Sequence, residues 1–283
     1  MVVSINDIPS IKEDFSASVT GEIDQIISQP LSISDEIEVL KLILSCIDLT
    51  TLEGADTTAK VEGMCQNVLE LEARNDIPNV AAICVYPTFA KIVSEKLKTT
   101  NVNTACVAGA FPSGQSSIEI KVQEIKWAIE EGATEIDMVI SRGKLLEGKY
   151  QEVFDEIVAI KECCGDVHLK VIIESGELQN NQNIKIASDL AMYAGADFIK
   201  TSTGKISEGA TYNSAYIMLT AIQKYYNATG IKIGMKAAGG ISDLETATNY
   251  LKLVENTTGK DWLTPTLFRF GASSLAKVVL NKF

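Results

Sequence analysis

The chain has 283 residues, 46% hydrophobic and 22% charged, and its 25 Lys and Arg against 37 Asp and Glu give a net charge of −12. This composition is typical of a globular protein and excludes disordered and collagen-like chains. Clustered positive charge is absent, so neither nucleic acid nor an anionic membrane is expected as a partner. Because no run of 18 apolar residues and no apolar leader is present, we expect a cytoplasmic protein without a membrane span.

Residues 35–44, DEIEVLKLIL, predict a helix that leads into a series of strands. We expect residues 1–45 to form a helical extension and residues 46–283 to form the main domain, which the extension flanks. Within that domain, short β-rich runs alternate with segments of helical periodicity. The runs span residues 46–50, 80–86, 103–111, 135–140, 168–174, 197–203, 231–240 and 267–272.

The segment between the third and fourth runs shows the helical pattern. Ser116 and Glu119 match a capping box, and apolar residues recur at Ile118, Val122, Ile125 and Ile129. Eight alternations of strand and helix predict parallel strands joined by right-handed crossovers, and eight such strands close a single (β/α)8, or TIM, barrel. A doubly wound α/β sheet is the alternative, but no GxGxxG sequence follows the first strand.

Cysteine and histidine usage limits the available chemistry. The six cysteines form no CxxC pair, and three lie in apolar strand-like runs, so we expect buried free thiols. The single histidine, His168, excludes any metal site built on a pair of histidines. It lies at the start of a strand, the barrel end away from active sites, which favours a structural role.

Charged residues interrupt strands that should be apolar, because parallel barrel strands are covered on both faces. In or at the ends of these strands stand Asp48, Asp137, Lys170, Glu174, Lys200 and Lys236. Active sites of such barrels lie at the carboxyl ends of the strands. A lone lysine there is most simply interpreted as an exposed or ion-paired residue at a strand end. Two lysines on neighbouring strands instead favour a functional role that depends on their mutual repulsion.

Two ammonium groups about 5 Å apart repel by roughly 3 kcal/mol at an effective dielectric constant near 20, which corresponds to about two pKa units. We therefore expect either Lys200 or Lys236 to lose its proton near neutral pH. A neutral amine in a closed pocket is the nucleophile that forms a Schiff base with a carbonyl, and the charged lysine can act as its electrostatic partner or acid. Asp137 is a candidate for proton transfer or for an ion pair with one of the lysines.

Glycine-rich loops follow the last three strands. Exposed N–H groups in the loops after strands seven and eight form the recurring phosphate site of this barrel. The residues are Gly204 and Lys205 after strand six, Gly239 and Gly240 after strand seven, and Gly271, Ser273 and Ser274 after strand eight. Any one of these turns is common, but their convergence favours phosphate binding.

Seven segments occur in order along the chain: IDLT (47–50), AICVYP (82–87), EIDMVI (135–140), LKVIIESGEL (169–178), ADFIKTSTGK (196–205), GMKAAGGI (234–241) and FRFGASS (268–274). In these segments the chain resembles the 2-deoxyribose-5-phosphate aldolases, a family of class I, Schiff-base aldolases. The resemblance spans residues 48–274. It implies reversible cleavage of 2-deoxy-D-ribose 5-phosphate to acetaldehyde and D-glyceraldehyde 3-phosphate, a step of deoxyribonucleotide breakdown, with no metal or other cofactor.

The resemblance also implies roles for individual residues. Lys200 would form the Schiff base, Lys236 would lower the pKa of Lys200, and Asp137 would relay protons with a bound water. Lys170, Asp48, Glu174 and Thr203 would support this polar network. Cys84 would lie near the substrate, and the phosphate contacts would come from Gly204, Lys205, Gly239, Gly240, Gly271, Ser273 and Ser274.

Two features depart from relatives. Ser242 stands where some relatives place an arginine after the glycine pair, so a positive charge is missing from the expected phosphate site. The chain also ends in LNKF in place of the tyrosine-ending tail of some members, so protonation of the enamine would depend more on Asp137 and water.

Two other functions remain open. A metal-assisted enolising enzyme would use Asp48, Asp137 and Glu174 as oxygen ligands for Mg²⁺. A catalytically silent sugar-phosphate-binding barrel would need only the glycine loops. The sequence is compatible with a homodimer but does not set the oligomeric state.

Overall fold

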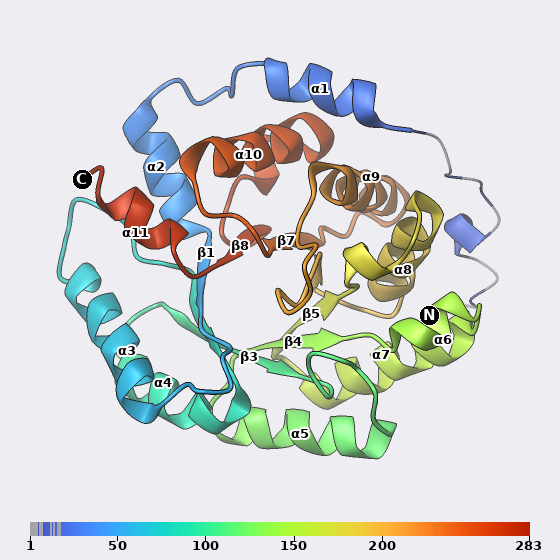
Figure 1. Ribbon diagram of the computed structural model, residues 1–283, viewed down its shortest axis with the longest axis horizontal. Helices are drawn as coiled ribbons and strands as arrows, with labels where there is room; N and C mark the ends of the chain where they lie inside the picture. Colours follow the sequence, from blue (N-terminus) through green and yellow to red (C-terminus); the bar gives the residue numbers. More distant parts are fainter. Residues whose placement is uncertain (1–4, 6–7, 12, 14, 16–17) are drawn as a thin grey trace.

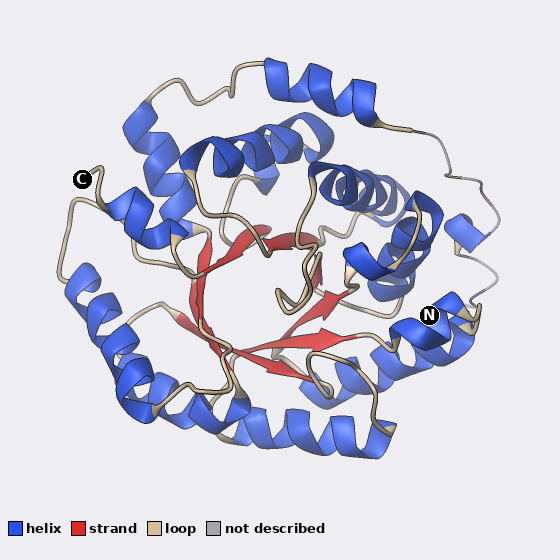
Figure 2. Ribbon diagram, in the orientation of Figure 1, coloured by secondary structure: helices blue, strands red, loops and turns tan. Residues whose placement is uncertain are grey.

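The computed structural model describes the chain apart from residues 1–4, 6–7, 12, 14 and 16–17. At its centre, eight parallel strands form a closed barrel in which each strand pairs with the next and β8 pairs with β1 (Figure 2). The strands are β1 (Ile47–Thr50), β2 (Ala82–Val85), β3 (Asn103–Ala108), β4 (Glu135–Val139), β5 (His168–Ile172), β6 (Phe198–Lys200), β7 (Gly234–Ala238) and β8 (Phe268–Ala272). The predicted (β/α)8 barrel is confirmed.

Helices form a layer around the barrel (Figure 1). They are α3 (Thr58–Glu72), α4 (Ala90–Leu97), α5 (Ile118–Glu130), α6 (Arg142–Leu146), α7 (Tyr150–Cys164), α8 (Asn181–Tyr193), α9 (Tyr212–Thr229), α10 (Leu244–Thr258) and α11 (Leu275–Leu280). Short 3₁₀ turns lie at Pro9–Ile11, Pro87–Phe89, Ser175–Glu177 and Lys260–Trp262. Several helix starts are fixed by a side-chain oxygen that accepts a hydrogen bond from the backbone N–H three residues on, at Thr57, Asn180, Thr211 and Asp243.

Two helices precede the barrel, α1 (Thr20–Ser28) and α2 (Glu36–Ser45). They lie outside the ring of strands, α1 against α9 and α10 and α2 against α10 and α11 (Figure 1). The apolar face of α2 is buried at Leu40, Ile43 and Leu44, which explains why this segment packs onto the barrel. In the described part of the chain, the helices include none that is long and apolar enough to cross a membrane.

All eight predicted strands are longer than the observed ones, and β6 and β7 differ most from their predicted ranges. β6 ends at Lys200 because the N–H of Thr203 donates to the side chain of Glu174 (3.0 Å) and not to a neighbouring strand. β7 begins at Gly234, three residues later than predicted, after Gly230 ends α9 in the left-handed conformation. Both differences shorten the barrel wall and lengthen the loops beside the strand ends.

The predicted start of α5 is also wrong, by one residue. The N-cap is Ser117 and not Ser116, because the Ser117 carbonyl accepts the first helical hydrogen bond, from the N–H of Lys121 (3.1 Å). No side-chain bond of Ser117 caps the helix. The apolar stripe continues inward as predicted, with Ile125 buried.

Cysteine and histidine lie where the sequence predicts. All six cysteines are free; Cys163 is half-buried and the other five are buried. Burial raises the pKa of the Cys46 thiol to about 12, so this thiol stays protonated. His168 is exposed at the first position of β5, away from the strand ends that carry the site described below.

Candidate active site

Asp137, Lys170, Lys200 and Lys236 lie on four neighbouring strands, β4 to β7. Asp137 pairs in register with Lys170, and Lys200 pairs with Lys236. All four are at most 2% exposed. The barrel therefore brings together the three strand lysines and the aspartate that the sequence singles out, and burial at this depth requires that their charges be compensated.

The Asp137 carboxylate is shared by all three lysines. Its Oδ2 accepts hydrogen bonds from the Nζ atoms of Lys200 and Lys236, each at 2.7 Å, and its Oδ1 accepts one from Lys170 at 3.0 Å. Because Lys200 and Lys236 contact the same oxygen, their nitrogens are immediate neighbours. The three lysines hold the pKa of Asp137 well below its usual range even though burial opposes this, so the group remains a carboxylate.

The pKa values of the two neighbouring lysines are shifted in opposite directions. Burial, and then the ammonium of Lys236, lowers the pKa of Lys200, with Asp137 acting in the opposite sense. Burial also opposes the charge of Lys236, but the carboxylates of Asp137 and Asp48 more than offset it and hold the pKa well above its usual value. Lys236 Nζ lies 2.5 Å from Asp48 Oδ2, a contact of its own that explains the asymmetry.

Two further charged residues, Glu135 and Arg269, complete the buried cluster, and the sequence analysis does not identify them. The Arg269 guanidinium lies 2.6 Å from Asp48 and 2.9 Å from Glu135, and Lys170 also donates to Glu135. Strand alternation could have identified Glu135 from the sequence, because it places this residue on the same face of β4 as Asp137. The cluster has four basic and three acidic side chains, so it becomes electroneutral when one lysine is neutral.

Glu174 and Thr203 form a separate contact, so the expectation that they belong to the lysine network is wrong. Glu174 follows the end of β5 in the left-handed conformation (φ 54°), which breaks the strand alternation that would have aligned it with Lys170. Its carboxylate accepts hydrogen bonds from the N–H and hydroxyl of Thr203 and lies 3.7 Å from Arg142. Among the described residues, no group of three or more His, Cys, Asp or Glu side chains could hold a metal ion.

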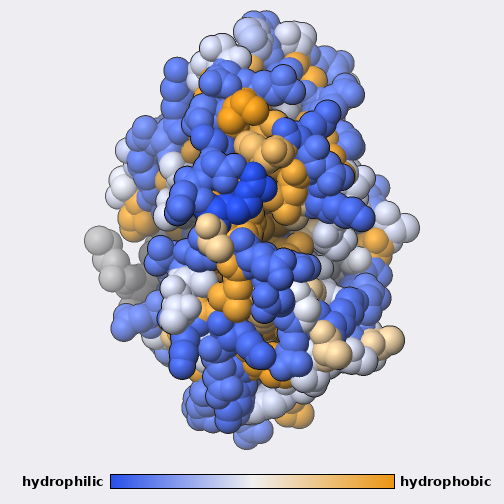
Figure 3. All heavy atoms as spheres, turned by 90° about the vertical axis from the view of Figure 1, so that its left-hand side faces the viewer, coloured by the Kyte–Doolittle hydropathy of each residue, from blue (hydrophilic) through white to orange (hydrophobic). Residues whose placement is uncertain are grey.

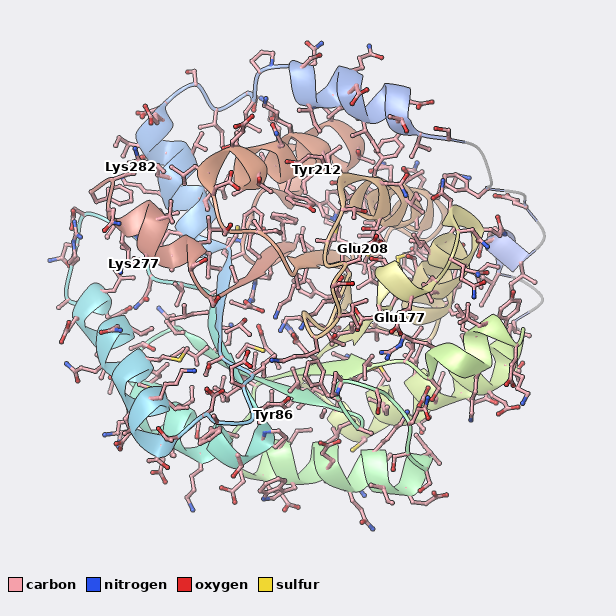
Figure 4. All side chains as sticks on the ribbon, viewed as in Figure 1. Tyr86, Glu177, Glu208, Tyr212, Lys277 and Lys282 are labelled. Carbon is pink, nitrogen blue, oxygen red and sulfur yellow. The ribbon has the colours of Figure 1, made fainter. Side chains whose placement is uncertain are left out.

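A cavity of about 1060 Å³ opens at the carboxyl ends of the strands. Tyr86, Glu177 and Glu208, from the loops after β2, β5 and β6, lie around the barrel opening in Figure 4. Lys200 lines the cavity, whereas Asp137 is fully buried beside it. The predicted phosphate residues all line it as well: Gly204, Lys205, Gly239, Gly240, Gly271, Ser273 and Ser274.

Cys84 lies at the edge of the lysine cluster. Its Sγ is 3.9 Å from Asp137 Oδ2, and the side chain is fully buried. Burial raises the pKa of the Cys84 thiol, so this side chain is uncharged beside the lysine cluster. The family resemblance implies that Cys84 lies near the substrate, and the structure places it beside Asp137.

The glycines of the loops have different structural reasons. Gly239 and Gly240 adopt φ values of 89° and 82°, a left-handed backbone that other residues rarely take. Gly271 has another reason, since a Cβ there would lie 2.8 Å from the Cβ of Ala238 and 3.1 Å from the Cε of Lys236. Gly271 therefore makes room for the lysine beneath the cavity.

Positive charge at the cavity mouth comes partly from Lys205. Its ammonium lies 2.8 Å from Glu53 Oε1, and its N–H donates to the Thr203 hydroxyl (3.1 Å). Glu53 is 67% exposed, so this ion pair is weak and open to competition by another anion. Ser242 also lines the cavity, at the place where the sequence lacks an arginine.

Comparison with known proteins agrees with this architecture. Residues 42–275 match the model of the DeoC/LacD family of aldolases. The deoxyribose-phosphate aldolase of Homo sapiens is 42% identical over 241 residues, covering 81% of this chain and 76% of the human one. That of Bos taurus is 40% identical over 244 residues, covering 82% and 76%.

A solved structure extends the comparison. Deoxyribose phosphate aldolase from Aeropyrum pernix, described as a unique tetramer, aligns with a TM-score of 0.69 and 25% identity, covering 93% of this chain and 97% of that one. The tetramer is a property of that protein, and a homodimer of this chain stays a prediction. The family match over most of the barrel, together with these relatives, establishes that the chain belongs to the DeoC/LacD aldolases and is a lyase.

Proposed function

We propose that this chain cleaves 2-deoxy-D-ribose 5-phosphate reversibly to acetaldehyde and D-glyceraldehyde 3-phosphate through a Schiff base on Lys200. The observation that carries the proposal is the lysine itself, which is 2% exposed, lines the cavity and has a lowered pKa. The names of the human and bovine relatives support the substrate. The reaction would serve deoxyribonucleotide breakdown in the cytoplasm.

The chemistry begins at the aldehyde of the open-chain sugar. The neutral Nζ of Lys200 attacks C1, and loss of water from the adduct leaves a protonated imine. Removal of the proton from the C3 hydroxyl breaks the C2–C3 bond, and the bonding electron pair moves into the imine to give an enamine. D-glyceraldehyde 3-phosphate leaves, C2 of the enamine takes up a proton, and hydrolysis releases acetaldehyde and regenerates Lys200.

Asp137 and Lys236, the charged neighbours of Lys200, have different roles in the reaction. Asp137 is a carboxylate in direct contact with Lys200, so with a bound water it can accept and return the protons of adduct formation and enamine protonation. Lys236 stays charged and disfavours a second ammonium at Lys200. With Lys200 neutral the cluster has no net charge, and formation of the protonated imine adds one positive charge. Asp137 lies where it can stabilise that charge.

The phosphate would bind at the glycine loops. Gly204, Gly239 and Gly240 adopt left-handed backbones beside the cavity. Ser273 and Ser274 add hydroxyl groups from the loop after β8. Backbone N–H groups and hydroxyls arranged in this way are suited to a phosphate monoester.

Lys205→Ala should raise the KM for 2-deoxyribose 5-phosphate roughly 10- to 150-fold, because it removes one charge-assisted hydrogen bond of about 1.5 to 3 kcal/mol. The KM for unphosphorylated 2-deoxyribose should change much less. Ser242→Arg provides the converse test and should lower the KM for the phosphorylated sugar alone. Equal effects on both sugars in steady-state assays would show that these loops do not hold the phosphate.

Incubation with EDTA should leave the activity unchanged, because the protonated imine takes up the electron pair that a metal ion would otherwise stabilise. Initial rates before and after chelation, and after addition of Mg²⁺, are the measurement. Loss on chelation with recovery on Mg²⁺ would favour the metal-assisted enolising alternative. Of that proposed ligand set, Glu174 uses both carboxylate oxygens to accept hydrogen bonds from Thr203.

The direct assay follows both products. The purified chain, given 2-deoxyribose 5-phosphate, should release acetaldehyde and D-glyceraldehyde 3-phosphate in equal amounts. Binding of the sugar phosphate without either product would favour a catalytically silent barrel.

A further inference from the structure

The cavity extends beyond the phosphate loops to a wall formed by α3 and α11. That wall includes apolar and polar side chains of both helices, among them Met64, Asn67, Leu71, Lys277 and Leu280. Figure 3 looks onto this side of the molecule and shows a run of hydrophobic side chains bordered by hydrophilic ones. Apolar surroundings strengthen the attraction between a bound anion and a nearby cation.

Five basic side chains line the cavity, and four of them have a carboxylate partner. The pairs are Lys200 with Asp137 (2.7 Å), Lys205 with Glu53 (2.8 Å), Lys60 with Asp56 (2.5 Å) and Arg74 with Asp76 (2.6 Å). The fifth, Lys277, makes no ion pair with any residue that the structure describes. Its charge is therefore available to a bound anion.

Lys277 lies near one of the proposed phosphate contacts, Ser274. Ser274 is the N-cap of α11 and Lys277 is the third helical residue, and both line the cavity together with Ser273. Helical side chains lean toward the N-terminus of their helix, and side chains three residues apart are neighbours about 5 to 6 Å apart. The Lys277 ammonium can thus reach an oxygen held by the Ser274 hydroxyl.

We propose that Lys277 binds the phosphate monoester of the substrate and supplies the positive charge that Ser242 does not. This inference rests on the proposed function, since it assigns one more contact at the same site. An unpaired ammonium takes up a dianion without losing an existing ion pair, whereas Lys205 must first release Glu53. The phosphate is then flanked by two lysines, one from the loop after β6 and one from the helix after β8.

The test compares Lys277→Gln with Lys282→Gln. Lys282 is an exposed lysine of the same C-terminal segment that does not line the cavity, and Figure 4 labels the two on opposite sides of α11. Lys277→Gln should raise the ratio of the KM for 2-deoxyribose 5-phosphate to that for 2-deoxyribose about tenfold, and the inhibition constant of inorganic phosphate similarly. Lys282→Gln should leave both quantities unchanged.

An unchanged ratio of the two KM values in Lys277→Gln would overturn the assignment. Equal changes in Lys277→Gln and Lys282→Gln would also overturn it, because they would reflect only the overall charge of the protein. Trapping of acetaldehyde by borohydride on wild-type protein separates this outcome from failure of the proposed function, because acetaldehyde carries no phosphate. Trapping with an unchanged KM ratio would remove Lys277 alone from the site. Absence of trapping would overturn the Schiff-base function and the Lys277 assignment with it.

Discussion

Replacing Lys200 by methionine is expected to lower kcat for aldol cleavage on the order of 10⁵-fold or more, because methionine has no nitrogen to form the imine. Without that imine, the electron pair of the broken C–C bond has no acceptor. Asp137 would keep its contacts with Lys170 and Lys236, so the fold should be retained. Long incubations with sensitive detection of acetaldehyde measure the residual rate.

The matched control is Lys185→Met. Lys185 is also 2% exposed and also ion-paired, to Asp189 at 2.5 Å, but it lies on α8 and does not line the cavity. Its loss should lower the unfolding temperature while kcat stays close to that of the wild type. If Lys200→Met retains turnover within tenfold of the wild type, another residue must be the nucleophile.

Replacing Lys236 by methionine should shift the rise of kcat/KM with pH to higher pH. Burial and the Lys236 ammonium lower the pKa of Lys200, and Asp137 raises it, so removing the cation should let this pKa rise. A repulsion of roughly 3 kcal/mol corresponds to about two pKa units, so kcat/KM at pH 7 should fall about 100-fold. Much of the loss should be regained about two pH units higher.

The comparison variant is Lys170→Met. Lys170 also binds Asp137, but through Oδ1, whereas Lys236 shares Oδ2 with Lys200. Both variants remove one buried cation, but the shift in the pH profile should be larger for Lys236→Met. Identical pH profiles for wild type and Lys236→Met, with full activity at pH 7, would show that the two ammonium groups are not coupled.

The barrel and the core of the site could be predicted from the sequence because charged residues stand out in strands that should be apolar. Lys170, Lys200, Lys236 and Asp137 are such residues, and strand order alone makes them neighbours. Strand order does not set side-chain positions. It therefore does not predict that Lys200 and Lys236 share Asp137 Oδ2, or that Lys236 contacts Asp48.

The errors come from contacts between residues far apart in the chain. Glu174 turns into the left-handed region and binds Thr203, which ends β6 early and takes Glu174 out of the lysine cluster. Arg269 lies between two aromatic residues of β8, where nothing in the local sequence indicates that it reaches Asp48 and Glu135. The role proposed for Lys277 has no sequence signal either, since an exposed lysine on a short helix resembles any solvated one.

The central claim is that Lys200 forms a Schiff base, and the mass of the protein after incubation with acetaldehyde and borohydride tests it most directly. Reduction of the imine should add one two-carbon unit, about 28 Da, because the ethylidene group becomes a stable ethyl amine. Peptide mapping should place that unit on Lys200, and the Lys200→Met protein should show no addition. No increase in mass, or an adduct that maps to another lysine such as Lys236, would contradict the account.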